Sequence, residues 1–151
     1  MKISIADLND ANEILSLQKR AFIQEAELGV RNYNIPPLLQ DIESMKEDLK
    51  CYTILKAKRG NLIVGSVRAK QTDSVVYIGR LCVEPIFQKK GIGKKLLEAI
   101  EKKFSKATTY ELFTGAKSLR NRAFYKNAGY TEIEEFVSPE GVHLVKLRKS
   151  C

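Results

Sequence analysis

The sequence predicts an α+β fold in which a mixed, mostly antiparallel sheet is flanked by about four helices. Two observations carry this prediction. Residues 52–83 hold three segments with strand periodicity, separated by short turns, which indicates an antiparallel meander. After them, segments with helical spacing alternate with further strands. The chain has 151 residues, 44% of them hydrophobic, which is enough for one sizeable core, so a single domain over residues 1–151 is expected.

The first fifty residues are expected to form one strand and two helices. Residues 3–5 alternate apolar and polar side chains as in a short strand. Asp10 and Glu13 have capping-box spacing and precede a helical face over residues 14–22. Residues 28–37 contain a glycine, two asparagines and two prolines and are expected to form a loop. The second of these prolines suits the first turn of a second helix.

The rest of the chain is assigned in the same way. The strands of the meander are expected at residues 52–58, 62–71 and 75–83. The elements that follow are a helix over residues 92–104, a strand over 110–114, a helix over 120–127 that ends before Gly129, and a hairpin of 131–137 with 142–148. A strand therefore leads through a glycine-containing loop into an amphipathic helix.

The composition excludes several classes of protein. The first ten residues are too polar for a secretory signal and no apolar run approaches a membrane span, so a cytoplasmic protein without a membrane partner is expected. Three widely spaced cysteines and a single histidine, His143, argue against a disulfide framework and against a metal site. The net charge of +8 favours an anionic ligand or a nucleic acid.

The segment QKKGIGKK, residues 88–95, is the first candidate binding site. It lies between a predicted strand and a predicted helix, where free amides and the positive end of the helix dipole favour an anion such as pyrophosphate. Gly91 and Gly93 allow a close approach of the backbone. The segment has neither the Walker A spacing nor the dinucleotide-binding spacing. Taken alone, it is more typical of a turn before an amphipathic helix with solvated lysines.

The second candidate is the segment NRAFYKNAGY, residues 121–130. Asn121 and Tyr125 are four residues apart and share one face of the predicted helix. A phenol in this position can act as an acid, although a tyrosine on a short helix more often serves packing.

Together, RLCVEPIFQKKGIGKKLL and, about thirty residues later, SLRNRAFYKNAGY resemble the two signature segments of the GCN5-related N-acetyltransferases (GNAT). The first is similar to the family's acetyl-CoA pattern [QR]-x-x-G-x-[GA] behind a strand that ends in L-x-V-x-P. The second is similar to its N-x-x-x-[FY]-Y-x-x-x-G-[FY] pattern. The strand order extends the resemblance to nearly the whole chain, and the first fifty residues match in layout.

The resemblance implies a role for each matching residue, with acetyl-CoA as co-substrate and no metal. A bulged fourth strand would span residues 77–83, and its backbone at Leu81, Cys82 and Val83 would hold the pantetheine arm and the acetyl carbonyl. Asn121 would bind the pantetheine arm and Tyr125 would be the general acid beside the thioester sulfur. The backbone amides that would cradle the pyrophosphate belong to Gln88, Lys89, Lys90, Gly91, Ile92, Gly93 and Lys94. Lys126 or Arg122 would reach the 3′-phosphate.

The general base is not assigned by the resemblance. Relatives often carry a glutamate just before L-x-V on the fourth strand, where this chain has Gly79 and Arg80. An amine with a pKa of about 10.4 needs a base or a water chain to lose its proton at neutral pH. The carboxylates considered for this task are Glu25, Glu27, Asp41 and Glu111. Cys82 as an acyl-carrying nucleophile is the weaker interpretation, because no residue nearby in the sequence would activate its thiol.

Three classes of function stay open on the sequence alone. The first is transfer of an acetyl group to a primary amine of a small molecule or peptide, and the second is binding of acetyl-CoA without turnover. The third is a basic nucleic-acid-binding module, for which no RNP, KH or zinc motif is present. Glu25, Glu27 and Tyr33 would suit a cationic acceptor. The predicted C-terminal hairpin would allow a homodimer.

Overall fold

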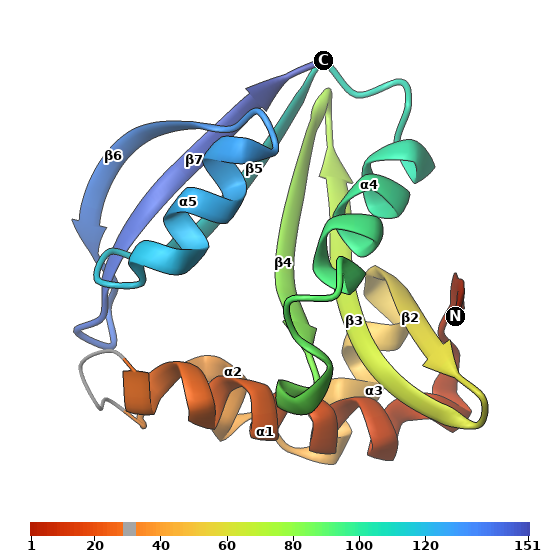
Figure 1. The fold of residues 1–151 in the computed structure, drawn as a ribbon. Coiled ribbons are helices and arrows are strands. Elements are labelled where there is room, and N and C mark those ends of the chain that lie inside the picture. The colour runs from red at the N-terminus through yellow and green to blue at the C-terminus, as the bar shows by residue number, and fades with distance from the viewer. Residues whose placement is uncertain (29–32) are drawn as a thin grey trace.

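A computed structural model describes residues 1–28 and 33–151. Its strands are β1 (Lys2–Ile5), β2 (Thr53–Arg59), β3 (Leu62–Thr72), β4 (Val75–Val83), β5 (Thr109–Gly115), β6 (Thr131–Val137) and β7 (His143–Ser150). Its α-helices are α1 (Ala11–Leu28), α2 (Pro36–Leu39), α3 (Ile42–Cys51), α4 (Ile92–Lys103) and α5 (Leu119–Asn127), and two 3-10 turns cover Leu8–Asp10 and Pro85–Phe87. The predicted α+β fold is confirmed (Figure 1).

The described strands form one sheet in the order β1-β2-β3-β4-β5-β7-β6. All neighbours pair antiparallel except β4 and β5, which are parallel and joined by α4. These two strands pair at only three positions, from Val75 opposite Thr109 to Tyr77 opposite Glu111. Beyond Tyr77 they part, and α1 runs across the end of the sheet where they separate (Figure 1). The opening exposes one edge of β4 in the middle of the sheet.

Two apolar cores lie on opposite faces of the sheet. One joins α4 and the Tyr125 ring of α5 to β2 through β5 and β7, and the other joins α1 and α3 to β2, β3 and Cys82. Neighbouring residues of one strand alternate between the cores: Ile54 packs under α1 and α3, whereas Leu55 packs under α4. Both cores meet at β4. Among the described residues, no helix is long and apolar enough to cross a membrane.

The structure corrects two local predictions near the N-terminus. The capping box lies three residues earlier than expected, because the Asp7 side chain accepts from the Asn9 amide and the Asp10 side chain from the Asp7 amide. The second helix is split into α2 and α3, which raises the number of α-helices from the expected four to five in the described residues. Asp41 caps α3 by accepting from the Ser44 amide. Of the predicted loop 28–37, residues 29–32 lie outside the described part.

Gly65 on β3 sets how closely α4 approaches the sheet. A Cβ atom built on Gly65 would lie 2.8 Å from Leu96 Cδ1, 3.2 Å from Ile92 Cγ2 and 3.3 Å from the Cys82 carbonyl oxygen. The contact therefore holds the first turn of α4, which contains Ile92, directly against β3 and β4. A larger side chain fits here only if Leu96 and Ile92 shift, or the helix moves with them.

We expect Gly65→Ala to lower the free energy of unfolding by about 1–3 kcal/mol through overpacking, and the thermal midpoint by roughly 2–10 °C. Thermal unfolding followed by circular dichroism measures the change. Gly79→Ala on β4 is the matched control, because its added Cβ would meet only Arg68 Nε at 3.8 Å, an ordinary contact. Equal stability of the two variants would contradict the role given to Gly65.

Candidate active site

A β-bulge in β4 lies beside the opening in the sheet. Between the pairs Arg68 with Gly79 and Ser66 with Cys82, β4 advances three residues while β3 advances two. The extra residue falls at Arg80, whose φ of 53° is in the left-handed region, which is uncommon for a non-glycine residue. The bulge predicted from the resemblance is therefore present. The three residues that follow it, 81–83, line the opening.

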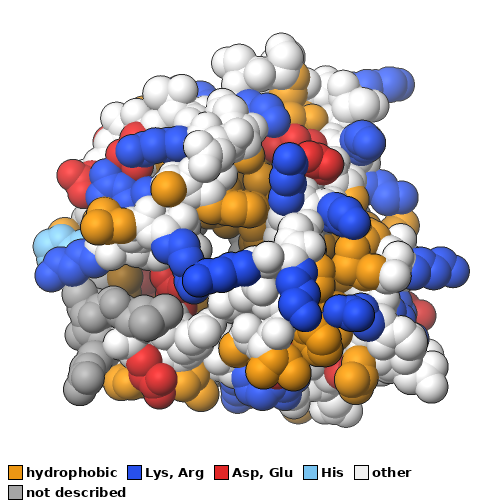
Figure 2. Space-filling view, in the orientation of Figure 1, with side chains coloured by type: hydrophobic (Ala, Val, Ile, Leu, Met, Phe, Trp, Pro, Cys, Tyr) orange, Lys and Arg blue, Asp and Glu red, His pale blue; other side chains and the backbone are white. Residues whose placement is uncertain are grey.

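A cavity of about 540 Å³ occupies the space between the separated strands. Its walls come from α1, from β4 and the turn after it, from the first turn of α4, and from α5. Figure 2 shows the hollow from outside, with lysine and arginine side chains around it. The basic residues among those that line it are Lys89, Lys94 and Arg120. The cavity is thus suited to an elongated ligand with negative charge.

The first turn of α4 forms one end of this cavity. Gly91 is its N-cap with a φ of 82°, no side chain caps the turn, and the first helical hydrogen bond runs from the Lys95 amide to the Gly91 carbonyl. The amides of residues 92–94 therefore have no partner within the helix, and they add to the positive end of its dipole. Gly93 faces Phe124 and Val83 closely enough that its Cβ position is 3.6 Å from the Phe124 ring. This is the geometry of an anion site.

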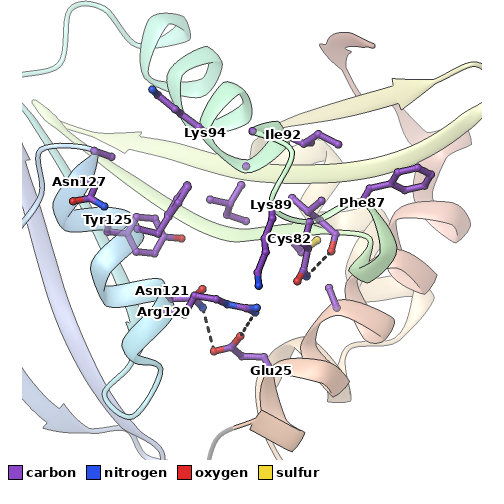
Figure 3. A pocket seen from close by; sticks show the side chains of 18 of the residues that line it. Glu25, Cys82, Phe87, Lys89, Ile92, Lys94, Arg120, Asn121, Tyr125 and Asn127 are labelled. Carbon is purple, nitrogen blue, oxygen red and sulfur yellow. Dashed lines mark hydrogen bonds and ion pairs between the residues drawn. The ribbon is translucent and has the colours of Figure 1, made fainter.

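Helix α5 supplies the opposite wall. Tyr125 is buried, and its ring meets Phe124 and Tyr130 edge-to-face at 5.1 and 5.9 Å between centroids. Figure 3 shows its hydroxyl directed into the cavity. Burial, with the nearby Glu25 and Cys82, raises the pKa of Tyr125 well above its ordinary value, so the phenol keeps its proton at neutral pH. A proton donor therefore faces the cavity.

Glu25 of α1 joins the wall formed by α5. Its carboxylate accepts hydrogen bonds from the Ser118 hydroxyl and, at 3.1 Å, from Asn121 Nδ2, and Arg120 Nη2 lies 4.0 Å away (Figure 3). The contact closes the gap between α1 and α5 across the parted strands. Asn121, predicted to bind a pantetheine arm, is thus held in place by Glu25. Within the described residues, Glu25 is the one carboxylate among those lining the cavity.

Cys82 lies in the wall formed by β4 but is not suited to nucleophilic chemistry. Its thiol is buried, and burial raises its pKa to about 12, against the smaller opposing effect of its hydrogen bonds with Ser66. The thiolate is the reactive form of cysteine, and almost none is present at neutral pH. The interpretation of Cys82 as an acyl carrier is therefore disfavoured.

The structure brings nearly all the predicted site residues together. The predicted residues that line the cavity are Leu81, Cys82, Val83, Gln88, Lys89, Gly91, Ile92, Gly93, Lys94, Asn121 and Tyr125. Lys90 does not: its side chain is exposed, with Nζ 5.6 Å from the centre of the Phe87 ring. Gln88 donates to the Gln24 side chain at 2.8 Å and to the Val83 carbonyl at 3.1 Å, which ties the turn after β4 to α1.

Other charged residues considered from the sequence lie outside the cavity. Arg122 and Lys126 pair with Glu132, at 2.6 and 3.3 Å, and the Arg122 hydrogen bond lowers the pKa of Glu132 to about 2. Glu111 is buried between Lys146 and Arg148. None of these side chains lines the cavity.

Several lining residues were not predicted from the sequence. They are Ala21, Phe22, Phe87, Arg120, Phe124, Asn127 and Ala128, whereas Glu25 was considered from the sequence as a base and for a cationic acceptor. Phe124, Asn127 and Ala128 belong to the same segment as Tyr125, and its helical period could have indicated them. The residues of α1 carried no such signal, because only the tertiary fold brings them to the site.

Comparisons with known proteins agree with this geometry. The family model described as acetyltransferase (GNAT) domain matches residues 26–151. The UPF0157 protein YqkA of Bacillus subtilis is 30% identical over 147 residues, which is 92% of this chain and 41% of YqkA, so the chain spans less than half of this curated relative.

Solved structures show the same fold at low identity. PaiA N-acetyltransferase of Thermoplasma acidophilum, in complex with coenzyme A, has a TM-score of 0.80 at 16% identity and covers all of both chains. YncA of Salmonella typhimurium, with its cofactor acetyl-CoA, has a TM-score of 0.79 at 17% identity over 99% of this chain and 93% of that one. With its parted strands, its bulged β4 and a family match over most of its length, the chain belongs to the GNAT acetyltransferase domain family.

Proposed function

We propose that the protein transfers the acetyl group of acetyl-CoA to a primary amine of a small molecule or peptide. The proposal is carried by three features that lie along one cavity. They are an anion site at the N-terminus of α4, an exposed strand edge on β4 after Tyr77, and a buried proton donor, Tyr125. Relatives of the same fold that hold coenzyme A or acetyl-CoA support this ligand.

The described residues fit acetyl-CoA in charge and in shape. The free amides of residues 92–94, with Lys89 and Lys94 beside them, match a pyrophosphate. After Tyr77 the backbone of β4 has no strand partner on the β5 side in the described part of the chain, so the amides of a pantetheine arm can pair with Leu81 to Val83 as an added strand would. The Val83 carbonyl already accepts from Gln88. Asn121 faces the same space from α5.

The chemistry asked of the chain is acetyl transfer in a ternary complex. The neutral amine nitrogen forms a bond to the thioester carbonyl carbon and the carbon–sulfur bond breaks. The nitrogen loses a proton to water, and the sulfur receives one. Amides of the bulged segment of β4 would stabilise the oxyanion. Tyr125 would protonate the leaving thiolate, a role that its raised pKa permits at neutral pH. Acetyl-CoA supplies the activated acetyl group.

Release of the coenzyme A thiol tests the proposal. We expect purified protein, acetyl-CoA and a panel of primary amines to release thiol at a rate proportional to enzyme and dependent on the amine, measured with a chromogenic disulfide. Cys51 and Cys151 are exposed and will react with the reagent, so the assay uses Cys51→Ser/Cys151→Ser protein. Stabilisation by acetyl-CoA without thiol release from any amine would favour binding without turnover.

A further inference from the structure

Arg80 is a charged residue that the proposed function leaves without a role. It is the extra residue of the β4 bulge, with a left-handed φ of 53°. It is not itself among the residues that line the cavity, but it directly precedes Leu81 and Cys82, which are. A non-glycine residue persists in this conformation only where the surrounding structure holds it there, and such positions cluster at ligand sites.

The charge of Arg80 is not balanced by a carboxylate in the described residues. Arg68 lies beside it and takes the nearest acid, with Nη1 at 2.6 Å from Asp48 Oδ2. Arg80 Nη1 donates instead to the neutral Gln40 Oε1 at 2.9 Å, and no described carboxylate is within 4.0 Å of its guanidinium. Burial, and then the charge of Arg68, lower the pKa of Arg80 to about 10, so it is still charged at neutral pH. Two guanidinium groups therefore lie near one carboxylate, Asp48, which pairs with Arg68.

Gln40 fixes the Arg80 guanidinium in place. The Gln40 amide nitrogen donates to Asp48 Oδ2 at 2.6 Å and to the Ser44 hydroxyl at 3.1 Å, which leaves Oε1 to accept from Arg80 and Gln18. Among the described residues, no fully buried side-chain nitrogen or oxygen lacks a partner. The other N–H groups of Arg80 consequently reach accessible space. A preorganised cation with free donors is suited to a carboxylate, which a guanidinium can bind through two hydrogen bonds.

We propose that Arg80 binds a carboxylate of the acceptor, so that the substrate is a primary amine that also carries a carboxylate, such as a free amino acid. This inference rests on the proposed acetyltransferase function. It replaces the cationic acceptor suggested by Glu25, Glu27 and Tyr33, because Glu25 is engaged by α5, and the other two side chains are exposed.

Arg80 would also ease deprotonation of the amine. A carboxylate close to an ammonium group favours its charged form, and a nearby cation disfavours it. When the acceptor carboxylate pairs with Arg80, its negative charge no longer stabilises the ammonium group, and the positive charge of Arg80 destabilises that group. A larger fraction of the amine is then neutral at a given pH. This compensates for the absence of a glutamate at this place on β4.

The test compares each common amino acid with its own carboxamide, which keeps the amine and replaces the carboxylate by a neutral group of the same shape. We expect the kcat/KM of the preferred acid to exceed that of its amide by at least about tenfold, the usual size of a charge-assisted hydrogen bond. In Arg80→Gln, the acid-to-amide ratio should fall towards one, and Arg80→Lys should keep part of it. A variant that misfolds would lose activity towards the acid and the amide alike, so the ratio between them would not change selectively.

Arg59→Gln is the control, since it removes the same charge from the end of β2 and should leave the ratio unchanged. Equal turnover of acids and amides by the wild type, or an unchanged ratio in Arg80→Gln, would overturn the inference and leave the acetyltransferase function standing. Thiol release with the amides but not with the acids would also overturn the inference and leave the acetyltransferase function standing. If no primary amine releases thiol, the proposed function fails, and this inference fails with it.

Discussion

Replacement of Gly91 by glutamate is expected to abolish the stabilisation of the protein by acetyl-CoA. Gly91 caps the first turn of α4, where the free amides of residues 92–94 would hold the pyrophosphate. A carboxylate at this point would occupy the anion site itself and would repel the phosphates. The variant should therefore lose the ligand without losing the fold.

The size of the effect follows from mass action. Acetyl-CoA at 100 times its Kd should add about 2.7 kcal/mol to the free energy of unfolding of the wild type. For a chain of this length that corresponds to a rise of roughly 5–10 °C in the thermal midpoint. The variant should show almost none of this rise, and differential scanning fluorimetry with and without acetyl-CoA measures both values.

Gly141→Glu provides a control matched in backbone strain. Gly141 lies in the β6–β7 turn with a φ of 83°, against 82° for Gly91, and an added Cβ meets nothing within 4 Å at either position. Both variants should therefore lose similar intrinsic stability, while only Gly141→Glu keeps the response to acetyl-CoA. A wild type that does not respond to saturating acetyl-CoA would remove the basis of the proposed function, and the basic surface would then be tested for polynucleotide binding.

The sheet and α4 were predictable from sequence because their signals are local. Alternation of side chains over residues 52–83 and helical spacing over residues 92–104 each follow from the burial of one face. The α2–α3 break was not predictable in this way. There, Gln40 turns its side chain into a buried network with Gln18, Asp48 and Arg80, and these tertiary bonds override the local helical pattern.

In the candidate site, too, the parts with local sequence signals were predictable and the parts that depend on tertiary contacts were not. The loop before α4 and the segment of Tyr125 are continuous in sequence, and the resemblance to known motifs identified them together. Glu25 reaches Asn121 across 96 positions of chain, and Arg80 gains its setting from Arg68 and Gln40. Contacts between such distant residues leave no periodicity in the sequence. For this reason the segments that line the cavity at the start of α4 and on α5 could be predicted, whereas the contacts of Glu25 and Arg80 could not.

Tyr125→Phe is expected to lower kcat by about a hundredfold or more, the usual contribution of a general acid, while the response to acetyl-CoA is retained. The substitution removes only the hydroxyl that faces the cavity and keeps the edge-to-face contacts with Phe124 and Tyr130. Thiol release at saturating substrates measures kcat, and the thermal shift shows that the ligand still binds.

Tyr130→Phe makes the same change in the same aromatic cluster and separates chemistry from packing. The Tyr130 hydroxyl donates to Glu101 at 2.7 Å, away from the cavity, so its loss should cost stability and leave kcat unchanged. The pH profile adds a second check. Burial raises the pKa of Tyr125 above its ordinary value of about 10. The phenol therefore stays protonated up to at least about pH 10, and kcat should not fall through loss of this proton at any lower pH. If both variants lost kcat equally, the role of Tyr125 would be packing, and water would have to protonate the departing thiolate.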